Sequence, residues 1–281
     1  MNSRRPNFVG VGVPRAGTTW LHELIGSHEN GFTPRNRKEV HYFDREFDRG
    51  DAWYLSFFAD AEEHHIARGE FTPHYLYDQR CIERIQSFGI PTVLLTLRDP
   101  VDRTWSNYLF KKRQDGFTGT LAEFLRAYPE MISWSRYDEH LGPWLDAFDS
   151  NLCLLIYEAM STDPDSLRCQ LGEALGLELS GFQERSEARV NASMVPRRPW
   201  LYKRMVRVNK WMFDHDLDVL ASTLKGVPGA MNFLRSANQS NRTALAPSDL
   251  ELELLLEKFS QPTSRLADMT GLDLSGWRGL E

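Results

Sequence analysis

Phosphate-binding chemistry is indicated by a glycine-bearing loop near the start of the chain. Gly12 and Gly17 are five residues apart, which is the glycine spacing of phosphate-binding loops of the form G-x-x-x-x-G-K-[ST]. Here Thr18 and Thr19 follow directly, without that lysine, and the cation of the loop is Arg15 instead. The loop N–H groups, the hydroxyls and the positive end of the following helix suit a compact phosphate-bearing group better than a magnesium-bound triphosphate. The alternative is an ordinary strand–turn–helix with a surface arginine.

A second anion site is indicated by Arg98 and Ser106. Arg98 directly follows the apolar run 92–97, and Ser106 lies about two turns into a helix that Pro100 is able to begin. A guanidinium fork with a nearby hydroxyl suits a terminal phosphate monoester. The strand does not end in an aspartate of the kind that binds magnesium, which argues against a kinase or nucleoside triphosphatase.

Buried strands that alternate with helices must position these groups. Apolar runs predict strands over 8–12, 66–71, 92–97 and 151–157, and helical spacing predicts helices over 18–27, 51–61, 78–88, 100–109, 120–127, 134–148, 163–176 and 248–271. Such alternation predicts a parallel α/β sheet whose ligands bind beyond the carboxyl ends of the strands. Arg15, Arg98 and Glu158 all fall at those ends. We expect one domain over 1–281, with a nucleotide-binding core over 8–176 and a mostly helical extension over 177–281 that contributes to the cleft.

Composition limits the class of protein. The 281 residues carry a net charge of −6, which argues against a general nucleic-acid-binding protein. No apolar run reaches the roughly 18 residues of a membrane span, and the N-terminal stretch does not resemble a signal peptide. Three widely spaced cysteines without a C-x-x-C pair, Cys81, Cys153 and Cys169, favour a reducing compartment and argue against a disulfide framework or zinc site. We therefore expect a cytoplasmic protein without a metal, and His64–His65 as a solvated edge.

At this point the sequence resembles the sulfotransferases that use 3′-phosphoadenosine 5′-phosphosulfate (PAPS), in their heparan-sulfate-type and bacterial branch. PRAGTTWL at 14–21 is similar to their 5′-phosphosulfate loop, and LRDPVDRTWSNY at 97–108 to their 3′-phosphate signature. KEVHYF at 38–43 and GEFTPHYL at 69–76 also match that branch. The two phosphate motifs stand in the expected order, about 80 residues apart.

The resemblance implies a P-loop-like fold and a role for each motif. PAPS would be the donor, and adenosine 3′,5′-bisphosphate the product. Glu39 would be the base that takes the proton from an acceptor hydroxyl or amine during in-line transfer, and no metal would be required. The cations beside the transferred group would be Arg15, Lys38 and His41. The donor would be bound by Arg15, Ala16, Gly17, Thr18, Thr19 and Trp20 at one end and by Arg98 and Ser106 at the other.

Several alternatives remain open. Many family members have lysine where this chain has Arg15, which would act as a fixed cation and not as a proton donor. His41 is able to share or replace Glu39 as the base. The basic stretch 197–210 closes over the nucleotide with Arg197 or Arg198, contacts an anionic membrane, or is a solvated helix face. The acceptor is a small molecule, glycan or lipid-like compound, with cleft residues expected in 29–50, 71–77 and 110–140. The rival functions are a nucleotide-dependent phosphotransferase and a non-catalytic nucleotide-binding module.

Overall fold

A five-stranded parallel sheet forms the centre of the computed structural model, which describes residues 4–182, 195–196, 239–240 and 246–280. The strands lie in the order β2-β3-β1-β4-β5, and all four pairings are parallel. Their bounds are β1 Phe8–Gly12, β2 Gly31–Phe32, β3 Ala67–Phe71, β4 Thr92–Leu97 and β5 Leu152–Ile156. A separate antiparallel pair joins β6 (Val195–Pro196) to β7 (Gln239–Ser240).

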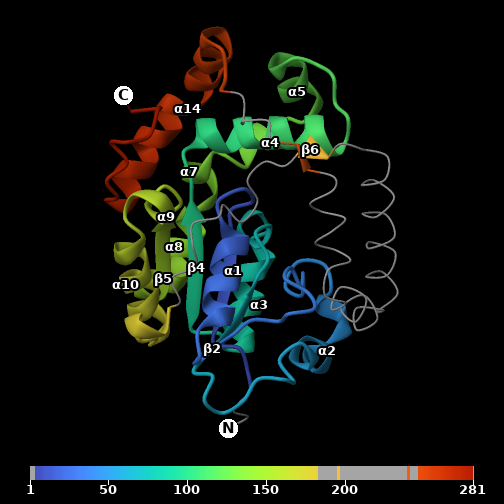
Figure 1. The fold of residues 1–281 in the computed structure, drawn as a ribbon, viewed down its shortest axis with the longest axis vertical. Coiled ribbons are helices and arrows are strands. Elements are labelled where there is room, and N and C mark those ends of the chain that lie inside the picture. The colour runs from blue at the N-terminus through green and yellow to red at the C-terminus, as the bar shows by residue number, and fades with distance from the viewer. Residues whose placement is uncertain (1–3, 183–194, 197–238, 241–245, 281) are drawn as a thin grey trace.

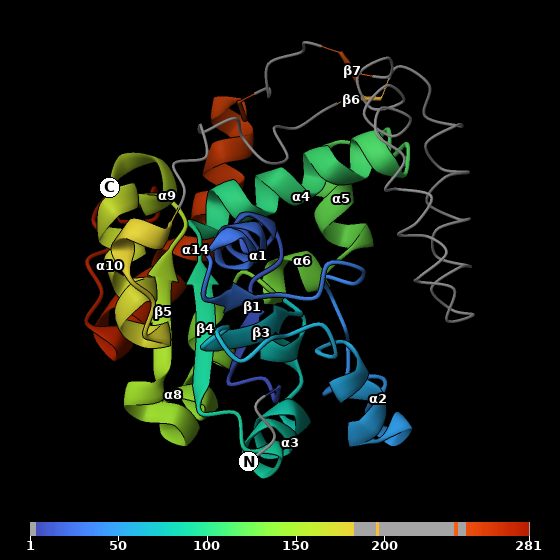
Figure 2. The same ribbon diagram turned by 60° about the horizontal axis from the view of Figure 1, so that its bottom comes forward.

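Helices cover both faces of this sheet (Figures 1 and 2). Among the described residues they are α1 Thr18–Ser27, α2 Asp51–Ser56, α3 Arg80–Phe88, α4 Pro100–Gln114, α5 Leu121–Ala127, α6 Glu130–Ser133, α7 Tyr137–His140, α8 Gly142–Phe148, α9 Ala159–Thr162, α10 Pro164–Leu175 and α14 Asp249–Thr270. Short 3-10 helices are η1 Phe47–Arg49, η2 Tyr75–Tyr77, η3 Asp149–Asn151 and η4 Leu179–Gly181.

Alternation along the strands divides the core into two layers. In β1, Val9 and Val11 pack on one face of the sheet in a cluster with residues of α3 and α8. Phe8 points to the other face and joins a cluster with residues of α1 and α10. All five residues of β1 are buried, as expected for a central parallel strand covered on both faces. A third apolar cluster joins α4, α5 and α14.

The carboxyl edge of the sheet is where α1 and α4 begin. The chain leaves β1 through a five-residue loop into α1, and leaves β4 through Arg98 and Asp99 into α4. Figure 1 shows α4 lying across the end of β4, on the side of the molecule opposite the N-terminus. Asp99 caps α4 by accepting hydrogen bonds from the N–H groups of Val101 and Asp102. The topology therefore brings both predicted phosphate motifs to one edge.

Most predicted elements are confirmed, including the parallel α/β class, the strand over 92–97 and the helix over 18–27. The capping box of Ser248 and Glu251 begins α14, and Gly271 ends it in the left-handed region. The prediction of a single helix over 134–148 is wrong. The chain forms two shorter helices there instead, α7 and α8, because Gly142 and Pro143 begin a new helix, and proline supplies no N–H to continue the preceding turn. The helix predicted over 51–61 ends at Ser56.

None of the helices in the described residues combines the length and the apolar character needed to cross a membrane. The three cysteines are unpaired: Cys81 is buried, Cys153 is half-buried and Cys169 is exposed.

Candidate functional site

The loop between β1 and α1 is shaped to receive an anion. Gly17 precedes the helix at φ 77°, and Arg15 also has a positive φ of 74°. The N–H of Val13 donates to Thr96 O at 2.9 Å, which anchors the loop to β4. The first N–H groups of an α-helix have no partner within the helix, so those at the start of α1 are available to a ligand. No acidic side chain lies in the first turn of α1 to compete for them.

The two phosphate motifs meet directly. Arg15 Nε and Nη2 each donate to Ser106 Oγ at 3.1 Å, and Arg98 Nη1 donates to Arg15 O at 2.9 Å. The Arg98 guanidinium carbon lies 4.4 Å from the centre of the Tyr157 ring. Its Nε is buried without a hydrogen-bond partner in the part of the chain that the structure describes. The corner therefore holds guanidinium groups that still have donor capacity.

Positive charge accumulates around Arg15. Burial, followed by the charges of Arg98, Arg113 and Arg103, lowers the pKa of Arg15 to about 10, although the nearby Tyr157 acts in the opposite direction. Arg15 remains protonated at neutral pH. Within the described residues, neither Arg15 nor Arg98 forms an ion pair with a carboxylate. A bound anion would supply the missing negative charge.

Buried side chains hold this corner in place. Arg103, on α4, is fully buried and donates to Pro14 O at 3.0 Å and to Ser135 Oγ at 2.7 Å. Glu158 accepts from the N–H of Asp99 and from Trp277 Nε1. Both residues hold the corner in place, and Arg103 lies inside the protein rather than on the helix surface.

Lys38 connects Glu39 to the start of α1, directly after the loop. Lys38 Nζ contacts Thr18 Oγ1 at 3.1 Å and Glu39 Oε1 at 3.2 Å. His41 Nε2 lies 3.7 Å from Glu39 Oε2, and the other ring nitrogen of His41 bonds to Asp44 at 2.9 Å. The Glu39 side chain is 39% exposed, so an incoming molecule is able to reach its carboxylate.

The pKa values of Glu39 and His41 indicate which of the two is protonated at neutral pH. Burial raises the pKa of Glu39, but the hydrogen bond from His41 and the charge of Lys38 outweigh burial and bring that pKa to about 2. Burial lowers the pKa of His41, yet its bonds to Asp44 and Glu39 raise it to about 9. At neutral pH Glu39 is therefore an anion and His41 a cation, so Glu39 is the group able to accept a proton.

Residues 70–75 hold the segment after Glu39 in place through hydrogen bonds. Thr72 Oγ1 accepts from the N–H of His41 and donates to Glu70 Oε2 at 2.8 Å. Tyr75 Oη accepts from the N–H of Phe43. Burial raises the pKa of Glu70 to about 7. Thr72 and Tyr75 are fully buried, so they brace the site rather than line a cleft.

A cavity of about 1380 Å³ opens beside Lys38 and Thr19. Its walls come from α1, residues 31–36, α2 and residues 60–65, and they include the aromatic rings of Trp53 and Phe57. The predicted cleft segment 29–50 contributes to this cavity, whereas 71–77 and 110–140 do not line it.

The remaining predicted residues divide as follows. Ala16 is fully buried within the loop, and Trp20 packs against the apolar cluster beneath α1. Arg197, Arg198 and the basic stretch 197–210 lie outside the described residues. His64 is exposed and faces Glu62, which agrees with its interpretation as a solvated edge.

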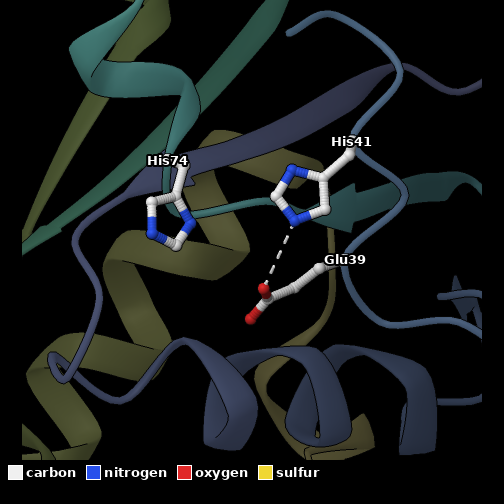
Figure 3. A group of neighbouring side chains, drawn as sticks. All are labelled: Glu39, His41 and His74. Atoms are coloured by element: carbon white, nitrogen blue, oxygen red, sulfur yellow. Dashed lines mark ion pairs between the residues drawn. The ribbon is translucent and has the colours of Figure 1, made fainter. Parts of the chain in front are cut away.

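Sequence reasoning missed Asp44 and His74. Asp44 lies three residues after His41, so a search for a carboxylate that orients the imidazole would have found it. His74 lies within the GEFTPHYL stretch but carried no signal of its own. It reaches the site because β3 delivers it there, beside Glu39 and His41 (Figure 3).

Fold and site together define a parallel α/β protein of the P-loop-like class, with a cationic loop at the carboxyl edge of its sheet. A family model described as "Sulfotransferase domain" matches residues 5–195, so the chain belongs to the sulfotransferase-domain family. This match confirms the family that the motifs indicated.

Individual relatives agree with this family. Heparan sulfate glucosamine 3-O-sulfotransferase 3A1 of Mus musculus is 30% identical over 184 residues, which cover 62% of this chain and 46% of that protein. Membrane-associated sulfotransferase kil1 of Dictyostelium discoideum is 32% identical over 108 residues, which cover 37% and 23%. The chain thus spans about half the length or less of these curated relatives.

A solved structure confirms the fold. The crystal structure of a sulfotransferase from Alicyclobacillus acidocaldarius superposes with a TM-score of 0.66 at 21% identity, over 98% of this chain and 99% of that one. The P-loop-like parallel sheet predicted from the sequence is therefore confirmed.

Proposed function

We propose that this chain transfers a sulfuryl group from PAPS to a hydroxyl or amine of a sugar, lipid or secondary-metabolite acceptor. The observation that carries the proposal is the Lys38 bridge, because it joins the loop hydroxyl of Thr18 to the carboxylate of Glu39 through contacts of 3.1 and 3.2 Å. A group held at the loop would lie next to an ionised carboxylate. Membership of the sulfotransferase family supports the same reaction.

The residues present fit an anionic nucleotide donor. When bound, the donor would supply the activated sulfuryl group. The loop Arg15 to Thr19 would hold its 5′ end through backbone N–H groups and hydroxyls, and Arg98 with Ser106 would hold its 3′-phosphate. The unpartnered Arg98 Nε and the accumulated positive charge around Arg15 support this assignment. Arg15 remains a fixed cation, so we assign no proton donation to the loop.

Glu39 is the base in this proposal. It is ionised at neutral pH, whereas His41 already carries its proton. Glu39 would take the proton of the acceptor as the acceptor oxygen or nitrogen attacks. Lys38 and Arg15 would stabilise the charge that develops on the transferred group and the leaving oxygen, as preorganised cations do in transferases generally.

We propose the cavity beside Lys38 as the acceptor site. Aromatic rings with polar groups around them suit a hydroxyl-bearing ring compound. The similarity to a heparan sulfate glucosamine 3-O-sulfotransferase supports a sugar among the acceptor classes. We also propose a cytoplasmic location, which the three unpaired cysteines support.

A kinase is less well supported. The Asp99 carboxylate accepts from the N–H groups of Val101, Asp102 and Arg278, so it serves as a helix cap and not as a magnesium ligand.

The test separates donor binding from turnover. Adenosine 3′,5′-bisphosphate should raise the melting temperature of the protein, and ADP should raise it much less. Glu39→Gln should keep the shift with the bisphosphate and lose transfer of labelled sulfate from PAPS to a screened acceptor. Full turnover in Glu39→Gln would overturn the assignment of the base. An equal shift with ADP would overturn the donor assignment. Bisphosphate binding by wild-type protein with no transfer to any acceptor would favour the non-catalytic binding module.

A further inference from the structure

Glu39, His41 and His74 form a three-residue group with the composition of a metal-binding site. Each offers one ligand atom, and these atoms all lie within 4.8 Å of one another (Figure 3). His41 and Glu39 come from the segment after β2, and His74 comes from the turn after β3. Among the described residues this is the group of three potential ligands that meets such a distance limit.

His41 is held in the orientation of a metal ligand. Its Nδ1 bonds to Asp44 at 2.9 Å, which leaves Nε2 facing Glu39. A carboxylate on one imidazole nitrogen fixes the ring and strengthens the other nitrogen as a ligand, and this arrangement is the usual outer shell of protein zinc sites. The N–H of His41 is also held by Thr72 Oγ1, so both ring and backbone are fixed.

The imidazole of His74 has a ring nitrogen that is able to bind a further ligand. Its Nδ1 is buried and has no hydrogen-bond partner within the described part of the chain. The ring packs edge-on against Trp134 at 5.2 Å and lies 5.9 Å from the His41 ring, centre to centre. A buried polar atom without a partner calls for an explanation, and the role assigned to Glu39 does not supply one.

We propose that Glu39, His41 and His74 bind a divalent transition-metal ion of the zinc type. Two imidazole nitrogens and one carboxylate oxygen are the protein ligands of many zinc sites with one open position. Magnesium and calcium prefer oxygen ligands, so this set selects against them.

His41 and Glu39 are already close to the spacing of two ligands of one ion, and the His74 ligand atom lies within 4.8 Å of both. Ligands at about 2.0–2.1 Å from a tetrahedral zinc ion lie roughly 3.4 Å apart, against 3.7 Å between His41 Nε2 and Glu39 Oε2 here. Lys38 also contacts Thr18, so it keeps a partner when Glu39 turns to the ion. Ligation needs neutral imidazoles, so binding displaces the proton that His41 carries.

A metal ion at this site would regulate the sulfuryl transfer, and this regulatory role rests on the proposed function. An ion bound to Glu39 would hold a carboxylate oxygen and lower the basicity of the group that would take the acceptor proton. The ion would therefore act as an inhibitor.

The experiment is a titration of tag-free, metal-free protein with Co²⁺ alone, followed by visible absorption and equilibrium dialysis. We expect one ion per chain, with the intense absorption of a four- or five-coordinate site. His74→Asn should weaken binding at least about tenfold. Unchanged melting curves or circular dichroism will show that each variant is folded.

His64→Asn is the matched control, because it removes an imidazole that faces a carboxylate at the same distance of 3.7 Å, and no described residue completes that pair as a group of three ligands. It should leave Co²⁺ binding unchanged. The proposal is overturned if wild-type protein shows no saturable binding, or if His74→Asn binds Co²⁺ as tightly as His64→Asn does.

The two proposals fail separately. Zn²⁺ should inhibit sulfate transfer, and a chelator should restore it. Tight Co²⁺ binding that depends on His74, in a protein without transfer activity, would contradict the proposed function and support the metal site. Full activity without Co²⁺ binding would do the reverse.

Discussion

The Asp44–His41 pair makes a quantitative prediction about stability and pH. The bond to Asp44 is the largest of the interactions that raise the pKa of His41 to about 9 from the ordinary value of 6.5. The perturbation is Asp44→Asn, which keeps the shape of the side chain and removes its charge. The His41 side chain is only 15% exposed and that of Asp44 is 8% exposed, so solvent screens the pair weakly.

The magnitude follows from proton linkage. A raised pKa in the folded state means that the folded protein binds the proton of His41 more tightly than the unfolded chain does. The difference between 6.5 and about 9, at roughly 1.4 kcal/mol per pKa unit, corresponds to about 3 kcal/mol. This stabilisation is fully present below pH 6.5 and is lost as the pH rises through 9.

The assay is urea denaturation of both proteins between pH 6 and pH 10. The wild-type free energy of unfolding should fall by about 3 kcal/mol across this range on account of His41, and that of Asp44→Asn by less than about 1.5 kcal/mol. The matched control is Asp78→Asn, because Asp78 pairs with Arg80, which stays charged throughout. NMR titration of the His41 ring gives the pKa directly. If Asp44→Asn loses stability with pH as steeply as wild type, the pair does not hold the proton on His41.

Three further predictions concern the anion corner. Arg98→Ala should weaken binding of adenosine 3′,5′-bisphosphate about 10–150-fold in calorimetry, since a hydrogen bond to a charged group contributes about 1.5–3 kcal/mol; unchanged affinity would place the phosphate elsewhere. Gly17→Ala should lower the free energy of unfolding by at least about 1 kcal/mol more than Gly271→Ala. Both glycines are in the left-handed region (φ 77°, ψ 8° and φ 67°, ψ 11°), but an added Cβ at Gly17 would clash with Met160 Sδ, whereas one at Gly271 would have nothing within 4 Å; equal losses would contradict this reasoning. Arg103→Ala should cost about 3 kcal/mol in urea denaturation, because it empties a buried site and leaves Pro14 O without its donor; a loss below about 1 kcal/mol would show that Arg103 does not hold the loop.

The sequence predicted what depends on neighbours along the chain. The strands over 8–12 and 92–97 are apolar runs that must be buried, and Gly17 and Pro100 mark where helices begin. Parallel order then brings Arg15 and Arg98 to one edge without further information. The sequence alone therefore predicts that Arg15 and Arg98 lie together at this edge of the sheet.

What the sequence did not yield depends on contacts between distant segments. Arg103 bonds to a carbonyl 89 positions away, so its helical spacing alone could not show that it is buried. His74 joins Glu39 only because β3 runs beside β1 and ends at the same edge. The choice between Glu39 and His41 as the base required the contact with Asp44, which spacing suggests but does not establish. The prediction of one helix over 134–148 is wrong for a local reason: the apolar periodicity continues through Gly142 and Pro143, where the chain begins a new helix.

The last residues of the fold fasten the edge of the sheet where the first phosphate motifs lie. Arg278 N donates to Asp99 at 2.7 Å, and Trp277 Nε1 donates to Glu158 at 3.2 Å. The ribosome therefore synthesises β1, the loop after it, β4 and α4 long before it adds Trp277 and Arg278, which donate these bonds. The partners of the Arg278–Asp99 bond are 179 positions apart, so a chain truncated before residue 277 would keep Arg15, Arg98 and Ser106 but lack both of these hydrogen bonds.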